Sequence, residues 1–498
     1  MNLKTINYIL GRLLQVLALL MMVPLMVSII YREGVYDKLY FLIPILIAIA
    51  LGSLLVKFGD EKGHIYTREA LFSTAACWVL FSVIGAIPLY LTPTNYHTVL
   101  DAVFEMASGF TTCGASVAND VELLPHSIIF WRSLSHLIGG MGILVFTLAI
   151  LPKSNKESSN LLQAEMPGPS FGKITPKLSQ TARVLYMIYL VMTLITTIFL
   201  LFGGMNLFDS MIFAMGAAGT GGFANKGLSV GYYDSRYIEV VLSIAMILFG
   251  VNFNLYYFAL IRSAREGFKS EELYWYLGIV TIATGLIFYN IRDLYDNLAY
   301  TGIQSLFTVS SIMTTTGYVS ADYGAWPMFS RNILILLMFI GGSAGSTAGG
   351  STAGGFKVSR FLILFKSTIN HVKKVINPRR VTITKIDGKR MDDELEEAVN
   401  KYLVLYILLF IIFMVIVSRD VENFESAFAA VATTFNNVGP GLVDFGPVNS
   451  FASMEPTSKF TLTLAMLFGR LELYPMLLLF SPYSYKKLSR RKEKNLDK

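Results

Sequence analysis

The sequence predicts an all-α polytopic membrane protein, in which an N-terminal helix pair precedes four helix–pore loop–helix repeats. Three observations predict this fold: the composition, ten long apolar runs, and a short motif that recurs four times. Hydrophobic residues make up 54% of the 498 residues and charged residues only 15%, whereas a water-soluble domain carries about 25% charged residues. The composition therefore excludes a soluble globular protein.

Ten apolar runs are long enough to cross roughly 30 Å of hydrocarbon. The first is too long for the core of a signal peptide and lacks a small-residue cleavage site, so we expect it to be a spanning helix. We expect the eighth run to be interrupted. The runs cover residues 6–30, 39–56, 70–91, 127–151, 183–203, 237–261, 273–291, 332–376, 398–417 and 460–481.

The charges between these runs predict the orientation in the lipid bilayer. Segment 356–390 holds ten Lys or Arg against one acid, Asp387, whereas segment 93–126 holds four acids and no Lys or Arg. Because basic loops stay on the cytoplasmic side, we expect both termini to be cytoplasmic. The net charge of +7 is then a property of membrane topology, and we expect no nucleic-acid partner.

Four stretches between the spanning runs are apolar but too short to cross a membrane. Each opens with a polar residue, which we expect near the positive N-terminus of a short helix: Asp101, Asp209, Gln304 and Glu425. A glycine follows thirteen residues later in three stretches and fourteen later in the last: Gly114, Gly222, Gly317 and Gly439. One such motif alone would favour tight packing of small residues between helices. Four copies at the same spacing, to within one residue, favour re-entrant pore loops in a pseudo-fourfold arrangement around one pore.

The chemistry of these loops suits a cation. A cation that loses its water needs a cage of oxygen dipoles, which successive backbone carbonyls provide. Glycine readily adopts the positive φ that aims neighbouring carbonyls at one axis, and the helix C-termini add partial negative charge. We therefore predict a cation-binding filter from the following residues: Thr111, Thr112, Cys113, Gly114, Gly219, Thr220, Gly221, Gly222, Thr314, Thr315, Thr316, Gly317, Asn436, Asn437, Val438 and Gly439.

The stretch GGSAGSTAGGSTAGG at 341–355 interrupts a spanning run. Each glycine costs about 1 kcal/mol relative to alanine in a helix, so seven cost roughly 7 kcal/mol. We expect an unwound segment in mid-membrane that lines the cavity inside the filter and acts as a gate; a glycine-rich face for helix packing is the alternative. The predicted gate glycines are Gly341, Gly342, Gly345, Gly349, Gly350, Gly354 and Gly355.

Three cations near this segment are candidates for gating. Arg470 lies inside the last spanning run, where a charge is costly and normally faces a pore or a partner. The alternative pairs it with Glu472, although residues two apart point to different helix faces. Lys357 and Arg360 follow the glycine-rich stretch. Either they extend to lipid phosphates, or they take part in gating.

Other residues do not indicate a catalytic or cofactor site. Cys77 and Cys113 lie in or near apolar segments, so we expect neither a disulfide framework nor a metal cluster. Arg132 and His136, one turn apart, would repel a cation, and we expect them to pack against the first pore loop. The glycine-rich stretch lacks the Lys of a phosphate-binding loop, so we expect no cofactor.

Several long motifs resemble one known family. They are SLSHLIGGMGILVF (133–146), the four pore-loop motifs, the repeated STAGG within 341–355, and LFGRLELYP (467–475). Together with the extra N-terminal helix pair, they resemble the Trk/Ktr/HKT superfamily of potassium transporters, within it the bacterial Trk-type membrane subunit. By this resemblance the four loop glycines match the filter positions of the family. In having a glycine at position 114, the chain resembles the members that prefer potassium. Arg470 matches a pore-facing arginine, and 341–355 an intramembrane loop that blocks the pore.

The resemblance also implies a physiological setting. It implies potassium uptake across the bacterial cytoplasmic (inner) membrane by a homodimer, regulated by a cytosolic NAD- or ATP-type nucleotide-binding subunit. A less selective K⁺/Na⁺ channel and an ion-coupled symporter remain alternatives, and an intramembrane enzyme or a neutral-solute channel is more remote. The expected divisions are 1–66 (N-terminal transmembrane helix pair), 67–152 (first pore repeat), 153–262 (second), 263–390 (third, with gating loop 341–355) and 391–498 (fourth, with a basic tail).

Overall fold

The computed structural model describes residues 1–61, 63, 65–142, 178–261, 270–347, 357–380, 382–391, 393–446 and 449–482. The regular elements within these residues are helices, joined by loops, and one two-stranded antiparallel hairpin of β1 (Lys385–Ile386) and β2 (Lys389–Arg390). The expected all-α fold class is confirmed.

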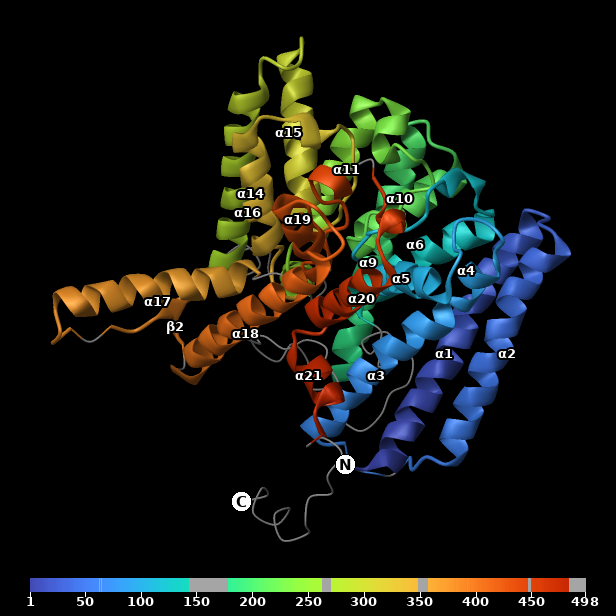
Figure 1. The fold of residues 1–498 in the computed structure, drawn as a ribbon. Coiled ribbons are helices and arrows are strands. Elements are labelled where there is room, and N and C mark those ends of the chain that lie inside the picture. Colours follow the sequence, from blue (N-terminus) through green and yellow to red (C-terminus); the bar gives the residue numbers. More distant parts are fainter. Residues whose placement is uncertain are drawn as a thin grey trace, which may run out of the picture.

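The N-terminal pair is α1 (Leu3–Ile30) and α2 (Val35–Lys57), which lie side by side at one edge of the molecule (Figure 1). The two helices approach most closely where glycines face each other. A Cβ atom on Gly11 would lie 2.6 Å from the carbonyl oxygen of Gly52, and one on Gly52 would lie 2.8 Å from that of Gly11. Small residues permit this close backbone packing between membrane helices.

Four groups of helices follow along the chain. The first comprises α3 (Thr67–Gly85), α4 (Ile87–Leu91), α5 (Val99–Phe110), η1 (Val121–Leu123) and α6 (His126–Met141). The second comprises α9 (Leu178–Phe202), α10 (Leu207–Gly219), η2 (Ser229–Tyr233), α11 (Arg236–Phe249) and α12 (Phe253–Ile261). The third comprises α14 (Glu271–Ile291), α15 (Leu298–Met313), η3 (Tyr323–Ala325), α16 (Met328–Ile340) and α17 (Val358–Ile376). The fourth comprises α18 (Asp393–Val417), α19 (Phe424–Phe435), η4 (Val443–Phe445), η5 (Phe451–Ser453), α20 (Pro456–Arg470) and α21 (Tyr474–Phe480).

By length and composition, six helices among the described residues could each cross a membrane, and a bent pair raises the number to seven. The six are Leu3–Ile30, Val35–Lys57, Thr67–Leu91, Ala182–Phe202, Glu271–Ile291 and Glu394–Val417. The other predicted runs are shorter or broken helices here, or they extend outside the described residues.

Breaks in the helices lie close to the glycine-rich segment. The predicted run 237–261 is not one straight helix, because α11 and α12 meet at 87°. The predicted run 460–481 is also divided: α20 ends at Arg470 and α21 begins at Tyr474, with φ of 57° at Glu472 and 66° at Leu473. The expected interruption of 332–376 is confirmed, since α16 ends at Ile340 and α17 begins at Val358.

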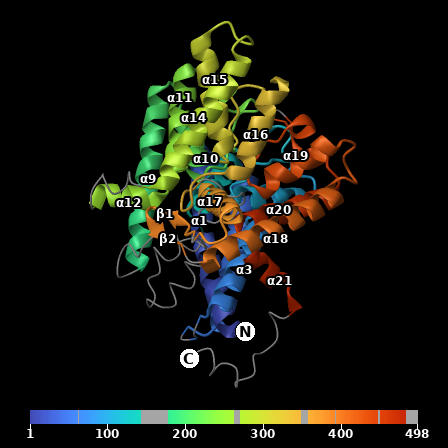
Figure 2. The same ribbon diagram turned by 90° about the vertical axis from the view of Figure 1, so that its left-hand side faces the viewer.

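Helix α17 and helix α18 extend away from α14 and α16 (Figure 1), and the β1–β2 hairpin between them lies beside α17 (Figure 2). Lys366 of α17 pairs with Glu271 at the start of α14 and donates to the carbonyl oxygen of Lys385 at 2.9 Å. The hairpin also reaches α14, because Asp387 accepts from the N–H of Glu271 at 2.7 Å. These contacts tie the hairpin to the helix that anchors the glycine-rich segment, as described below.

The four short helices begin as expected in all but one case. Asp101 lies in the first turn of α5, where it forms a capping box with Thr98. Asp209 and Glu425 lie in the first turns of α10 and α19. The expectation for Gln304 is wrong, because α15 begins six residues earlier, at Leu298, and Asn297 accepts hydrogen bonds from its first turn. Gln304 is instead buried in mid-helix and donates to Glu239 at 2.8 Å.

Candidate ion-filter site

The four pore loops share one backbone conformation. A residue with a left-handed backbone follows each short helix, and the predicted filter glycine, also with positive φ, comes two positions later. The first of these residues are Thr112 (57°), Thr220 (54°), Thr315 (56°) and Asn437 (53°). The glycines are Gly114 (85°), Gly222 (74°), Gly317 (79°) and Gly439 (99°).

The same hydrogen bonds close all four helices. The N–H of the residue before each glycine donates to the carbonyl five positions earlier: Cys113 to Ser108 (2.9 Å), Gly221 to Gly216 (2.9 Å), Thr316 to Ser311 (2.8 Å) and Val438 to Thr433 (2.8 Å). This bond belongs to the Schellman motif, which usually places glycine at the left-handed position. A β-branched threonine there is a genuine outlier, and such strain persists only where the surroundings impose it.

The four glycines lie in a ring. A Cβ atom on each would overlap, or lie too close to, the carbonyl oxygen that precedes the glycine of the next loop. The Cβ on Gly114 would face the carbonyl oxygen of Gly221, that on Gly222 the oxygen of Thr316, that on Gly317 the oxygen of Val438, and that on Gly439 the oxygen of Cys113. The ring therefore closes in chain order. Each of the four loops forms one wall of the ring, and its backbone packs directly against the backbone of the next loop. Only glycine provides this fit.

The ring opens on one side into a cavity of about 180 Å³ that all four glycines line. Polar side chains of the short helices hold the chain as it leaves the ring. Glu105 accepts from the N–H of Val117 at 2.9 Å, and Gln304 accepts from Ser320 at 2.6 Å. Asn225 donates to Asp209 at 2.5 Å, and Ser426 donates to Asp444 at 2.5 Å. One carboxylate or amide per loop thus fixes each wall of the cavity.

Several predicted filter side chains are engaged within the protein. The hydroxyls of Thr111 and Thr314 donate to carbonyls of their own helices at 2.7 Å. Asn436 accepts from the hydroxyl of Tyr406 at 2.6 Å. Cys113 and Cys77 are both buried, and no disulfide joins them in the described structure. Backbone carbonyls therefore remain the candidate ion ligands.

Residues 341–347 of the glycine-rich segment pack against the break between α11 and α12. The N–H of Ser343 donates to the carbonyl of Gly250 at 3.1 Å, and that of Thr347 donates to Phe249 at 3.3 Å. The last carbonyl groups of a helix have no hydrogen-bond partners within that helix. Here the glycine-rich segment supplies N–H donors for the carbonyls at the end of α11. Residues 341–347 are non-helical, as predicted, and protein groups satisfy several of their backbone N–H and C=O groups.

Two further contacts fasten this segment. The N–H of Ala344 donates to the buried carboxylate of Glu272 at 2.7 Å. The hydroxyl of Thr220, in the second filter loop, donates to the carbonyl of Thr347 at 2.7 Å. The segment therefore touches the second of the four loops directly. Of the predicted gate glycines, Gly341, Gly342 and Gly345 lie in the described part. Gly349, Gly350, Gly354 and Gly355 lie outside the described residues.

Arg470 is fully buried at the end of α20. Its guanidinium donates to the hydroxyl of Thr112, in the first filter loop, at 3.1 Å and also to the carbonyl of Gly139. It lies 5.1 Å from the ring centroid of Trp78. The charge is thus directed at the base of the first filter loop. The alternative pairing of Arg470 with Glu472 is wrong, because Glu472 pairs elsewhere.

Glu472 joins both cations that follow the glycine-rich segment. Its carboxylate lies 3.3 Å from Nζ of Lys357 and 2.5 Å from Nη2 of Arg360. All three side chains are buried, so Lys357 and Arg360 do not extend to lipid phosphates here. The guanidinium of Arg360 also lies 4.1 Å from the ring centroid of Tyr402. The break in the last helix is therefore held to the end of the glycine-rich segment.

Sequence reasoning missed two site residues. Glu272 offered no signal beyond an acid at the start of a spanning run. Phe223 follows Gly222 directly, and its side chain contacts Arg132 and His136. These two residues were expected to pack against the first pore loop, and their packing extends to the second. His136 stacks on Phe223 with centroids 4.2 Å apart. Only the folded chain brings these residues together.

The helical membrane architecture and the closed glycine ring define a membrane protein built around a candidate ion pore. Comparison with known proteins agrees. The TrkH family, described as cation transport proteins, matches residues 38–288 and 291–488. The chain belongs to this family of transport proteins, which are not enzymes.

Individual relatives cover nearly the whole chain. The Trk system potassium uptake protein TrkH of Salmonella typhimurium is 35% identical over 97% of this chain and 99% of its own length. The Trk system potassium uptake protein TrkG of Escherichia coli is 32% identical over 97% and 99%. The crystal structure of the potassium transporter TrkH from Vibrio parahaemolyticus superimposes with a TM-score of 0.86 at 29% identity, covering 98% of this chain and 100% of that one.

Proposed function

We propose that this chain takes up potassium ions across the bacterial cytoplasmic (inner) membrane through the ring of four glycines. The transported ion is K⁺, and both termini lie in the cytoplasm. The observation that carries the proposal is the ring itself. Four loops with the same backbone bring Gly114, Gly222, Gly317 and Gly439 against one another at the base of one cavity.

Electrostatics supports a cation rather than an anion. Each short helix directs its C-terminus, with its partial negative charge, toward the ring. The loops offer carbonyl dipoles without a net charge, which lets an ion be bound and released. Two buried cations contact the loops: Arg132 pairs with Glu105, and Arg470 donates to Thr112 and Gly139.

We assign the gate to the glycine-rich segment 341–355 together with Arg470. The described part of this segment contacts the second filter loop, and Arg470 contacts the first. Few side chains fill the segment, so a change in its backbone opens or closes the path below the ring. A short segment with two arrangements is a common switching device.

A regulatory partner and a second copy complete the proposal. The relatives are named as parts of a Trk system, which supports partner subunits for this chain. We propose a cytosolic NAD- or ATP-type nucleotide-binding regulatory subunit that acts on the cytoplasmic surface, and a homodimeric membrane component. The five predicted divisions of the chain are likewise part of the proposal.

The test is uptake of rubidium, a potassium analogue, into potassium-loaded liposomes that contain the purified chain. External potassium or sodium serves as the competitor. We expect potassium to block rubidium uptake and sodium at the same concentration to leave it nearly unchanged. Equal competition by the two ions would favour the less selective K⁺/Na⁺ channel. Uptake that requires a sodium or proton gradient would favour the ion-coupled symporter.

A further inference from the structure

We propose that Arg132, held by Glu105, positions the first two filter walls against each other and so contributes to the choice of potassium over sodium. The inference rests on the proposed function. Neither residue is an ion ligand in this proposal: both act through the loops that they hold.

The pair is buried beside the cavity that the four glycines line. Nη2 of Arg132 lies 2.6 Å from Oε1 of Glu105, and the two side chains are 2% and 0% exposed. Arg132 is one of the residues lining the cavity. A guanidinium beside a cation path repels the ion unless a carboxylate neutralises it. Since replacing a buried ion pair by apolar residues is often neutral or stabilising, stability alone does not account for this pair.

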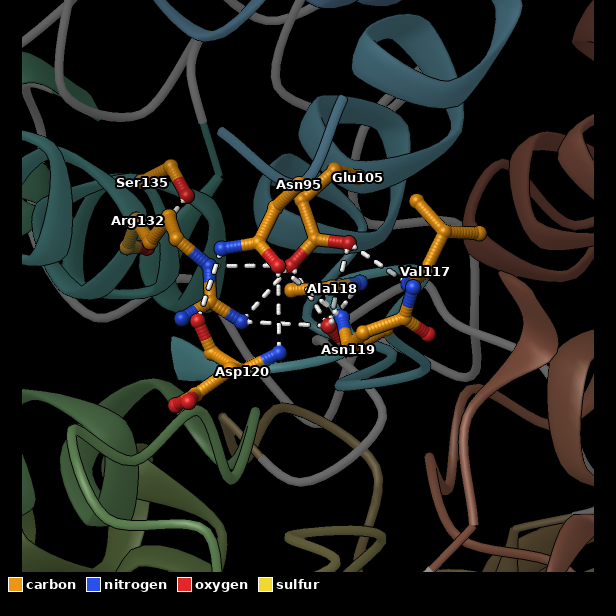
Figure 3. A network of polar contacts seen from close by, with 9 residues as sticks. Asn95, Glu105, Val117, Ala118, Asn119, Asp120, Arg132 and Ser135 are labelled. Carbon is orange, nitrogen blue, oxygen red and sulfur yellow. Dashed lines mark hydrogen bonds and ion pairs between the residues drawn. The ribbon is translucent and has the colours of Figure 1, made fainter. Parts of the chain in front are cut away.

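On one side the pair holds the first filter loop (Figure 3). Glu105 accepts from the N–H of Val117 at 2.9 Å and from the hydroxyl of Ser116 at 2.9 Å. Arg132 donates to the same hydroxyl at 3.3 Å. These residues follow Gly114 almost directly along the chain, so the pair limits how far the first wall moves.

On the other side Arg132 holds the second loop. Its guanidinium lies 4.2 Å from the ring centroid of Phe223, the residue after Gly222. His136, one turn further along α6, stacks on the same ring. A Cβ atom on Gly221 would overlap the imidazole of His136. One face of α6 therefore contacts the second wall both at the filter and just beyond it.

The contact between the first and second walls is where Gly114 meets the carbonyl of Gly221. The other boundaries also carry neutral hydrogen bonds between walls. Tyr318 donates to the carbonyl of Phe213 at 2.8 Å, and the N–H of Phe451 donates to the carbonyl of Ser116 at 2.9 Å. At the first boundary a planar guanidinium is suited to the task, because it pairs with a carboxylate and stacks on an aromatic ring at once.

This geometry bears on selectivity because both accounts of potassium selection depend on the carbonyls. One account attributes selectivity to the size of the cavity, the other to the number and strength of the carbonyl dipoles. In both, the carbonyl oxygens must stay at a distance that suits K⁺, the larger ion. Loosening one boundary lets the first two walls close on a smaller ion. Sodium then competes better, while ions still pass.

The test compares Arg132→Lys and Phe223→Leu with the wild-type chain in the rubidium uptake assay. Lysine keeps the charge beside Glu105 but loses the planar stack, and leucine removes the aromatic face without burying a charge. The readout is the ratio of sodium to potassium concentrations that halve uptake. We expect this ratio to fall by about tenfold in both variants, equivalent to ~1.4 kcal/mol, with rubidium uptake retained.

Lys459→Arg is the matched control. Lys459 of α20 is also buried, and it pairs with Asp101 at 2.7 Å. Asp101 lies on the same helix as Glu105, one turn earlier. The exchange alters a buried cation of α20 that pairs with the first turn of α5, and it leaves the residues of the filter loops unchanged. We expect the wild-type ratio in this variant.

The outcomes separate the inference from the proposed function. Wild-type ratios in both Arg132→Lys and Phe223→Leu would overturn the inference and leave the proposed function standing. Equal competition by sodium in the wild-type chain would overturn both. For a variant without uptake, the readout is the difference in unfolding temperature between potassium and sodium chloride, because an ion that binds the folded state stabilises it. Loss of that difference supports the inference, and its retention overturns it.

Discussion

Replacing Gly222 with alanine is expected to reduce rubidium uptake by at least about tenfold, the effect of ~1.4 kcal/mol on ion passage. Gly222 has φ of 74°, and an added methyl group would overlap the carbonyl oxygen of Thr316. A left-handed backbone costs a residue with a Cβ about 1–2 kcal/mol. The overlap comes in addition and displaces an oxygen of the third wall. The measurement is uptake per reconstituted protein.

Gly278→Ala is the matched control for this prediction. Gly278 lies within α14, where a Cβ atom would meet nothing within 4 Å. Alanine there is expected to stabilise the helix by about 1 kcal/mol and to leave uptake unchanged. If Gly222→Ala transported rubidium as fast as Gly278→Ala, the glycine ring would not be the ion path.

Replacing Glu472 with glutamine is expected to increase rubidium uptake in the absence of any partner. Glu472 pairs with two buried cations, Lys357 and Arg360. Removing one member of a buried ion pair costs about 3–5 kcal/mol, because the remaining charge is left without compensation. That cost falls on the arrangement in which the glycine-rich segment is fastened to the break in the last helix. We take this arrangement as the closed form of the gate proposed above, so the closed path loses this stabilisation in the variant.

Two further variants sharpen the test of Glu472. Adding Lys357→Met to Glu472→Gln removes one of the uncompensated charges and is expected to bring uptake back toward the wild-type rate. Glu397→Gln breaks an exposed ion pair with Lys401. Such pairs contribute about 0–1 kcal/mol, so uptake is expected to stay unchanged. Wild-type uptake by a folded Glu472→Gln variant would remove Glu472 from the gate.

Much of the fold could be predicted because membrane helices and glycine-bearing loops leave strong local signals. The interruption between Ile340 and Val358 follows from the helix cost of clustered glycines. The nearly equal spacing of four glycines from a polar residue indicated four related loops. The same spacing misplaced the start of α15, because Gln304 turned out to support the exit from the loop by accepting from Ser320. Spacing alone does not distinguish a helix cap from a side chain that bonds across the loop.

The breaks in α11–α12 and α20–α21 had no comparable signal. Both segments are apolar enough to read as continuous spans. Each break is stabilised by groups far away in the chain: Ser343 donates to the carbonyl of Gly250, and Glu472 pairs with Lys357. A helix gives up its own hydrogen bonds when another segment replaces them, and only the folded chain shows that segment.

By itself the sequence determined the membrane class, the four loops and the four glycines that form the ring, because composition, spacing and the absence of a side chain are properties of the chain alone. The tertiary structure decided which partners the buried charges take. Arg132 with Glu105, Glu472 with Lys357 and Arg360, and Arg470 with Thr112 all join separate elements of the fold. A buried charge requires a nearby counter-charge or polar group, and which one is nearby depends on how the helices pack.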